Sequence, residues 1–135
     1  MTELFDYGRR ILAQQPFSVL LGAELTRFEP GEAELTLHIR DALKQQHGFV
    51  HGGVISYLAD NSLAFVGGSV LTDVVTSEYK INYVRPAIGE QLVARACVLA
   101  SGKRQAVCQA EVYVIDGGQE KLVALAQGTL NKVDY

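Results

Sequence analysis

The stretch from Gln45 to Val66, QQHGFVHGG followed by VISYLADNSLAFV, decides how this chain folds and where chemistry can occur. Its second half is mostly apolar over the length of a helix, which predicts an enclosed helix over about 53–66 that Gly67-Gly68 would end. One acid, Asp60, lies within this run. Ionised carboxylates are rarely buried without a partner, so Asp60 is a candidate for chemistry.

The segments on either side of this helix predict an antiparallel sheet. The expected elements are a short helix from Thr2 to about Gln14 that Pro16 ends, and strands over about Val19–Phe28, Ala33–Ile39, Val74–Val84, Gln91–Ala100, Gln105–Ile115 and Lys121–Asn131. This order predicts an α+β fold with one sheet curled around one buried helix, in a single domain over 1–135. Because one sheet does not easily cover every face of such a helix, we expect a dimer.

The composition is that of an ordinary globular protein. The chain has 135 residues, of which 48% are hydrophobic and 20% charged, and its formal net charge of −3 gives no reason to expect nucleic-acid binding. The two cysteines, Cys97 and Cys108, fit a reduced cytosolic protein better than a disulfide scaffold. No signal peptide is evident, and the longest apolar run is too short to span a membrane. We therefore expect a soluble cytoplasmic protein without a membrane partner.

The spacing of four features in the central stretch is specific. An amide residue, Gln45, lies six positions before His51, Gly48 lies three before it, His51 begins a His-Gly-Gly step, and Asp60 follows nine positions after His51. This set resembles the active-site stretch of the hotdog-fold acyl-CoA thioesterases, in the branch that includes the phenylacetate-pathway and hydroxybenzoyl-CoA thioesterases. The stretch Thr76–Ala87 also resembles the strand that follows the helix in this family.

The resemblance implies a hotdog fold, in which a curved antiparallel sheet wraps one long central helix and a short N-terminal helix is added. It implies hydrolysis of an acyl-CoA to a free acid and coenzyme A, with no cofactor. Gly52 would use its backbone N–H to polarise the thioester carbonyl, with support from Gly53, as a helix N-terminus allows. Asp60 would be the nucleophile or the general base.

Three further residues take roles from the same resemblance. Gln45 would orient the carbonyl or the attacking water. His51 would hold the loop and the thioester end by hydrogen bonding, and Thr76 would lie near the attacking water.

Helix geometry separates the two halves of this site. Nine residues of helix rise roughly 13 Å and end about half a turn round, so Gly52 and Asp60 of one chain should not meet at one reacting carbon. Two antiparallel helices from two subunits would bring them together. We therefore expect shared sites in a homodimer, and dimers that pair into a tetramer.

Simpler interpretations exist for the same residues. Asp60 could be an acid hydrogen-bonded to helix neighbours, and Gly52-Gly53 could serve only a tight turn and close packing. His47 and His51 have a metal-like spacing but lack a third ligand nearby, so no metal is expected. His38 alternates out of a strand and is expected to be solvated.

The remaining candidates have two readings each. Arg85, Lys103 and Arg104 could bind the coenzyme A phosphates or be ordinary surface cations. The aromatic candidates for an acyl pocket or for the core are Phe49, Tyr57, Phe65 and Tyr83, with core preferred for Phe65. The two cysteines are read as small strand residues rather than nucleophiles.

Two other functions fit the same fold. One is an acyl-thioester hydratase or dehydratase, although the His-rich, Pro-containing loop of the dehydratases is absent. The other is a non-catalytic acyl-CoA-binding module. The acyl group itself is left open between small aromatic and medium-chain groups.

Overall fold

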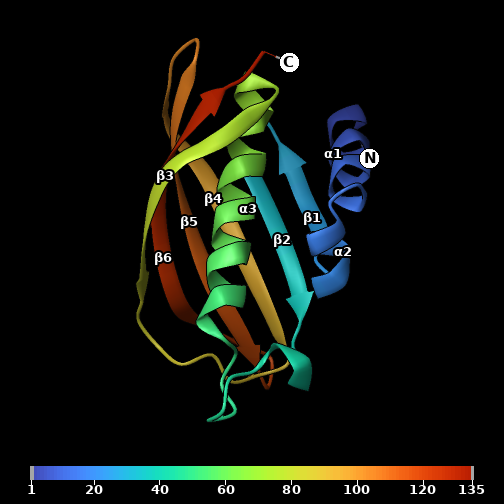
Figure 1. The fold of residues 1–135 in the computed structure, drawn as a ribbon, viewed down its shortest axis with the longest axis vertical. Helices are drawn as coiled ribbons and strands as arrows, with labels where there is room; N and C mark the ends of the chain where they lie inside the picture. Colours follow the sequence, from blue (N-terminus) through green and yellow to red (C-terminus); the bar gives the residue numbers. More distant parts are fainter. Residues whose placement is uncertain (1, 135) are drawn as a thin grey trace.

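The computed structural model describes residues 2–134 and contains one long helix against one sheet (Figure 1). The helices are α1 (Glu3–Ala13), α2 (Pro16–Leu21) and α3 (Gly52–Leu71), with a 3-10 turn η1 (Asp41–Leu43) before α3. The strands are β1 (Glu24–Glu29), β2 (Glu32–His38), β3 (Val74–Tyr83), β4 (Gln91–Ser101), β5 (Gln105–Asp116) and β6 (Gln119–Lys132). This is the expected α+β architecture.

The six strands form one sheet in the order β1-β2-β4-β5-β6-β3, and every neighbouring pair is antiparallel. The sheet curves behind α3, and α1 lies beside β1 at one edge (Figure 1). Alternate residues of β5, from Ala106 to Val114, are buried toward the helix, as the period of a half-buried strand requires. The core therefore lies between α3 and the concave face of the sheet.

The prediction for the region before β1 was wrong in one respect. Residues 16–21 form the short helix α2, because Pro16 occupies the first turn and Gly22 ends the helix with a φ of 83°. The strand expected from about Val19 therefore begins only at Glu24. Pro16 therefore begins a second helix two residues after the first helix and its cap. The short apolar run that follows Pro16 fits a helix turn as well as a strand, which is why its pattern misled the prediction.

The glycine pair in the central helix was also misread. α3 continues through Gly67 and Gly68 to Leu71. A Cβ on Gly67 would lie 2.7 Å from Cγ of Leu130 on β6, so glycine lets the helix approach the sheet closely. Gly67 serves packing and does not end the helix.

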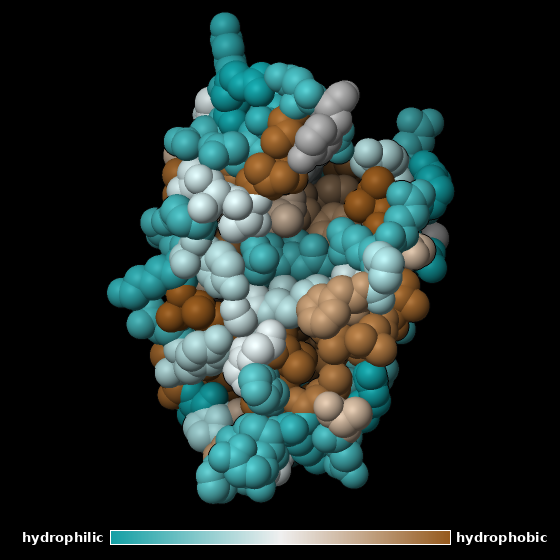
Figure 2. Space-filling view, in the orientation of Figure 1, coloured by the Kyte–Doolittle hydropathy of each residue, from teal (hydrophilic) through white to brown (hydrophobic). Residues whose placement is uncertain are grey.

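Among residues 2–134, no other helix or strand covers the face of α3 turned away from the sheet (Figures 1 and 2). The extra turn makes α3 20 residues long, and by length and composition alone it could cross a membrane. Half of its most apolar 18 residues are buried within the protein, against its own sheet, which is the arrangement of a core helix.

Strands β1 and β3 form the two edges of the sheet. One side of β3 pairs with β6 along its whole length, and the other side has no neighbouring strand among the described residues. An unpaired edge presents a row of free N–H and C=O groups, so β3 is open to pairing with another strand.

Candidate active site

The start of α3 leaves one backbone amide free. His51 is the N-cap, and its Nδ1 accepts a hydrogen bond of 2.8 Å from the N–H of Gly53. The N–H of Gly52 has no acceptor among residues 2–134. Because the first helical amides also carry the positive end of the helix dipole, Gly52 is positioned to bind an oxyanion. The amide of Gly53 is already used, so any support from Gly53 is indirect.

The cap also defines the state of His51. An Nδ1 that accepts a hydrogen bond is unprotonated, so in the neutral ring the proton lies on Nε2 and is available to donate. The backbone N–H of His51 donates to the carbonyl of Leu43 at 2.9 Å, which ties the loop to the helix start. His51 thus ties the loop to the helix start, and its contact with the thioester end stays a prediction.

The loop before α3 brings Gln45 to the free amide. Gln45 and Phe49 are joined by a backbone hydrogen bond of 2.9 Å, and Gly48 makes the tight turn between them with a φ of 87°. The side-chain Oε1 of Gln45 accepts from the N–H of His47, which leaves its Nε2 group as the free donor. A groove of about 390 Å³ is lined by Gln45, Phe49 and Gly52.

The other wall of this groove comes from the end of β3 and the turn after it. Tyr83 donates from its hydroxyl to the carbonyl of Gly52 at 3.2 Å, and Arg85 also lines the groove. Of the predicted site residues, Gln45, Gly52 and Arg85 therefore meet in one place. Tyr83, which sequence patterns left between pocket and core, belongs to this groove.

Asp60 lies near the middle of α3 and is half-buried. Its Oδ1 accepts a hydrogen bond of 2.7 Å from Oγ1 of Thr76 on β3. One turn earlier on α3, Ser56 pairs with the hydroxyl of Tyr79 on the same strand. These side-chain contacts fix the helix to the edge strand and orient the carboxylate, and they unite two predicted site residues, Asp60 and Thr76.

The amide and the acid do not meet within one chain. Eight residues of helix separate Gly52 from Asp60, which corresponds to an axial rise of about 12 Å. The two groups are instead held by opposite ends of β3. Thr76, near the start of the strand, donates to Asp60, and Tyr83, at its end, donates to the carbonyl of Gly52. One chain alone does not form a single reacting centre from these groups.

A polar cluster next to Asp60 was not predicted. Asn61 donates from Nδ2 to Oε1 of Gln15 at 3.1 Å and to the hydroxyl of Tyr57 at 3.2 Å, and Tyr57 donates to Oγ of Ser18 at 2.7 Å. Burial raises the pKa of Tyr57, so it stays protonated and donates. The cluster ties α2 to α3. Reading α2 as a helix would have placed Gln15 and Ser18 near each other, but not their contact with Asn61 on α3.

The three candidate cations do not converge in one chain. Arg104, in the turn between β4 and β5, pairs with Asp134 at 2.9 Å and with the carbonyl of Lys132, which lies opposite Val74 at the start of β3. Lys103 is in the same exposed turn. Arg85 instead follows the far end of β3, about 30 Å away at 3.3 Å per residue.

Three other candidate residues, Phe65, Cys108 and His38, have structural or surface positions outside the candidate site. Phe65 is buried and meets Phe28 edge to face at 5.4 Å, as predicted for core. Cys108 is buried, and burial raises the pKa of its thiol to about 11, so it is no thiolate nucleophile. His38 is exposed, as predicted. Within residues 2–134 no three His, Cys, Asp or Glu side chains lie close enough to hold a metal ion. That the enzyme works without a metal stays a prediction.

Comparison with known proteins identifies the family of this chain. The thioesterase superfamily matches residues 47–121, which span the loop, α3, β3, β4 and β5. The chain is 30% identical over 114 residues to the acyl-coenzyme A thioesterase PaaI of Escherichia coli K12, covering 84% of this chain and 79% of that protein. It is 27% identical to the medium/long-chain acyl-CoA thioesterase YigI of the same organism, covering 78% and 80%.

A solved structure gives the same result for the fold. A thioesterase family protein from Silicibacter pomeroyi superposes with a TM-score of 0.88 and 35% identity, covering 91% of this chain and 93% of that one. The expected hotdog fold is thus confirmed, and hydrolysis is favoured over hydration and over simple binding. The chain belongs to the thioesterase superfamily and is a thioester hydrolase of the PaaI-like kind.

Proposed function

We propose that this protein hydrolyses an acyl-CoA, with a small aromatic or medium-chain acyl group, to a free acid and coenzyme A in the cytoplasm. The observation that carries the proposal is the half-buried carboxylate of Asp60, held by Thr76 on a helix whose first amide is free. Two relatives named as acyl-CoA thioesterases, PaaI and YigI, support the substrate class.

Each group has a part in the reaction. The N–H of Gly52 stabilises the negative charge that develops on the thioester oxygen, and Nε2 of Gln45 is a second donor at that groove. Asp60 either attacks the thioester carbon or takes a proton from a water that does. Both routes need an ionised carboxylate and release the thiol of coenzyme A. In the direct route a water then cleaves the anhydride between the acyl group and Asp60, which releases the free acid and restores the carboxylate.

The proposal includes a homodimer, because the amide and the acid lie about 12 Å apart along one helix. The free edge of β3 supports this assembly. If two copies of β3 pair antiparallel, the Thr76 end of one strand meets the Tyr83 end of the other. Asp60 of one copy then faces Gly52 of its partner, and each dimer has two sites.

The same pairing would also collect the cations. Arg85 of one copy would approach the end of β3 where Lys103 and Arg104 of the other copy lie, and together they would bind the phosphates of coenzyme A. The face of α3 that no other element of residues 2–134 covers offers a second surface, through which dimers would pair into a tetramer.

The test is the substitution Asp60→Asn. An amide still accepts the hydrogen bond from Thr76, so the fold should be preserved, but it neither attacks nor accepts a proton. We expect kcat for thiol release from acyl-CoA substrates to fall about 10²- to 10⁴-fold. Thermal unfolding is the control, and wild-type turnover in a folded Asp60→Asn variant would refute the role of this residue.

A further inference from the structure

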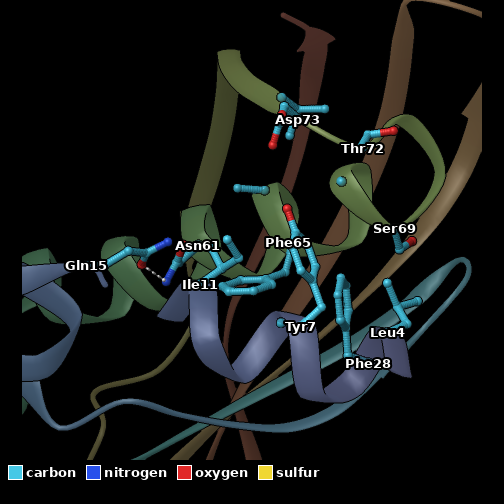
Figure 3. A pocket seen from close by; sticks show the side chains of 14 residues that line it. Leu4, Tyr7, Ile11, Gln15, Phe28, Asn61, Phe65, Ser69, Thr72 and Asp73 are labelled. Atoms are coloured by element: carbon cyan, nitrogen blue, oxygen red, sulfur yellow. Dashed lines mark hydrogen bonds between the residues drawn. The ribbon is translucent and has the colours of Figure 1, made fainter. Parts of the chain in front are cut away.

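A cavity of about 290 Å³ lies between α1 and the second half of α3 (Figure 3). Most of its wall is apolar, and the apolar side chains that line it are Leu4, Ile11, Phe28, Ala64, Phe65 and Val74. Figure 2 shows hydrophobic residues in a recess between the two helices. A cavity of this kind favours a ligand with little polar surface.

The cavity adjoins the proposed catalytic acid. Ala64 and Gly68 line it, and they follow Asp60 by one and two turns on the same face of α3. On the strand side, Val74 lines the cavity and lies two residues before Thr76, so both side chains are on one face of β3. The helix face and strand face that hold the Asp60–Thr76 pair thus continue as the walls of the cavity.

We infer that this cavity binds the acyl group of the substrate and selects an uncharged chain that is longer than a single aromatic ring. The inference rests on the proposed function and names its substrate class. An apolar cavity of about 150 Å³ holds one benzene, and this cavity is about twice as large. Its wall also extends about 10 Å along α3 from Asn61 to Gly68, which suits an extended medium-length chain.

The polar residues of the cavity restrict the far end of that chain. Gln15 and Asn61 form a hydrogen-bonded pair at the end next to Asp60 (Figure 3). The opposite end has Thr72 and Asp73, and Asp73 is the one charged side chain in the cavity wall formed by residues 2–134. A carboxylate at the end of the acyl chain would find no cation in this wall and would be repelled by Asp73. Dicarboxylic acyl groups are therefore disfavoured.

Gly68 sets the depth of the cavity. A Cβ on Gly68 would have no atom within 4 Å, whereas a Cβ on the neighbouring Gly67 would collide with Leu130. A side chain at position 68 would therefore extend into free space without disturbing the helix. Alanine and leucine are both good helix formers, so Gly68→Ala and Gly68→Leu fill the cavity in two steps.

The experiment compares thiol release from acetyl-CoA, octanoyl-CoA and succinyl-CoA. We expect the octanoyl-to-acetyl ratio of kcat/KM to fall at least ten-fold in Gly68→Leu, with Gly68→Ala between it and wild type, and we expect succinyl-CoA to be the poorest substrate throughout. The matched control is Gly102→Leu, the same change in the turn between β4 and β5, where a Cβ also meets no atom within 4 Å. Its ratio should equal that of wild type.

A binding measurement separates this inference from the proposed function. In an Asp60→Asn background, titration calorimetry should show that Gly68→Leu weakens octanoyl-CoA at least ten-fold relative to acetyl-CoA. If wild type releases no thiol, the proposed hydrolysis fails, and this selective loss of affinity would still support the cavity. If a folded Gly68→Leu variant keeps the wild-type ratio in turnover or in affinity, the acyl group binds elsewhere and the inference is overturned.

Discussion

The first turn of α3 and the middle of α3 present different chemical groups, and different contacts fix the position of each group. Gly52 offers a backbone N–H, and its position is set by the cap at His51 and by Tyr83. Asp60 offers a carboxylate, and its position is set by one side-chain hydrogen bond from Thr76. A straight helix keeps these groups about 12 Å apart, so a rigid element can position both parts of a site without uniting them.

The largest effect on kcat should come from removing the backbone N–H of Gly52 alone. Gly52 is the first residue of α3, where proline is well tolerated but has no N–H. We expect kcat in Gly52→Pro to be about 10²- to 10³-fold below that in Gly52→Ala, which keeps the N–H. Equal kcat values for the two folded variants would show that this amide does not stabilise the oxyanion.

A smaller effect should follow from loosening the acid. Thr76→Val keeps the shape of the side chain but removes the hydroxyl that donates to Asp60. A hydrogen bond to a charged group contributes about 1.5–3 kcal/mol, so we expect kcat to fall about ten- to hundred-fold, with Thr76→Ser close to wild type. If Val and Ser variants have the same kcat, Thr76 has no part in holding Asp60 for catalysis.

The smallest effect should come from changing how closely α3 packs against the sheet, because this packing positions both Gly52 and Asp60. Gly67→Ala should lower the free energy of unfolding by about 1–3 kcal/mol, because the new methyl group meets Leu130 at 2.7 Å. Gly68→Ala should raise it by about 0.5–1 kcal/mol, because the helix gains a better former in free space. Denaturant unfolding of both variants checks the pair, and a stable Gly67→Ala would mean that the helix does not approach β6 so closely.

The sequence predicted the sheet well because its strands alternate in polarity. The strand over 33–39 and the four strands after α3 were placed within a few residues. The errors fell where two structures share one pattern. Val19 and its apolar neighbours fit a strand or a helix turn, and Gly67 looked like a helix end although it packs against Leu130.

The candidate site was predictable to the extent that its spacing lies within one segment. Gln45, Gly52 and Asp60 are close in sequence, and the rise of a helix already separated the last two. Contacts between distant segments were not predictable. The cluster of Gln15, Ser18 and Asn61 joins α2 to α3, and it depends on a tertiary contact that no local pattern contains.

In the proposed dimer, Asp60 of one copy works with Gly52 of the other. Inactive Asp60→Asn and Gly52→Pro proteins should be mixed, unfolded and refolded together, and assayed for thiol release. If sites are shared between two copies, mixed dimers have one site with both natural residues, and we predict that about a quarter of wild-type activity returns. If the mixture stays as inactive as its parents although the two chains have assembled with each other, the amide and the acid do not act across the subunit boundary.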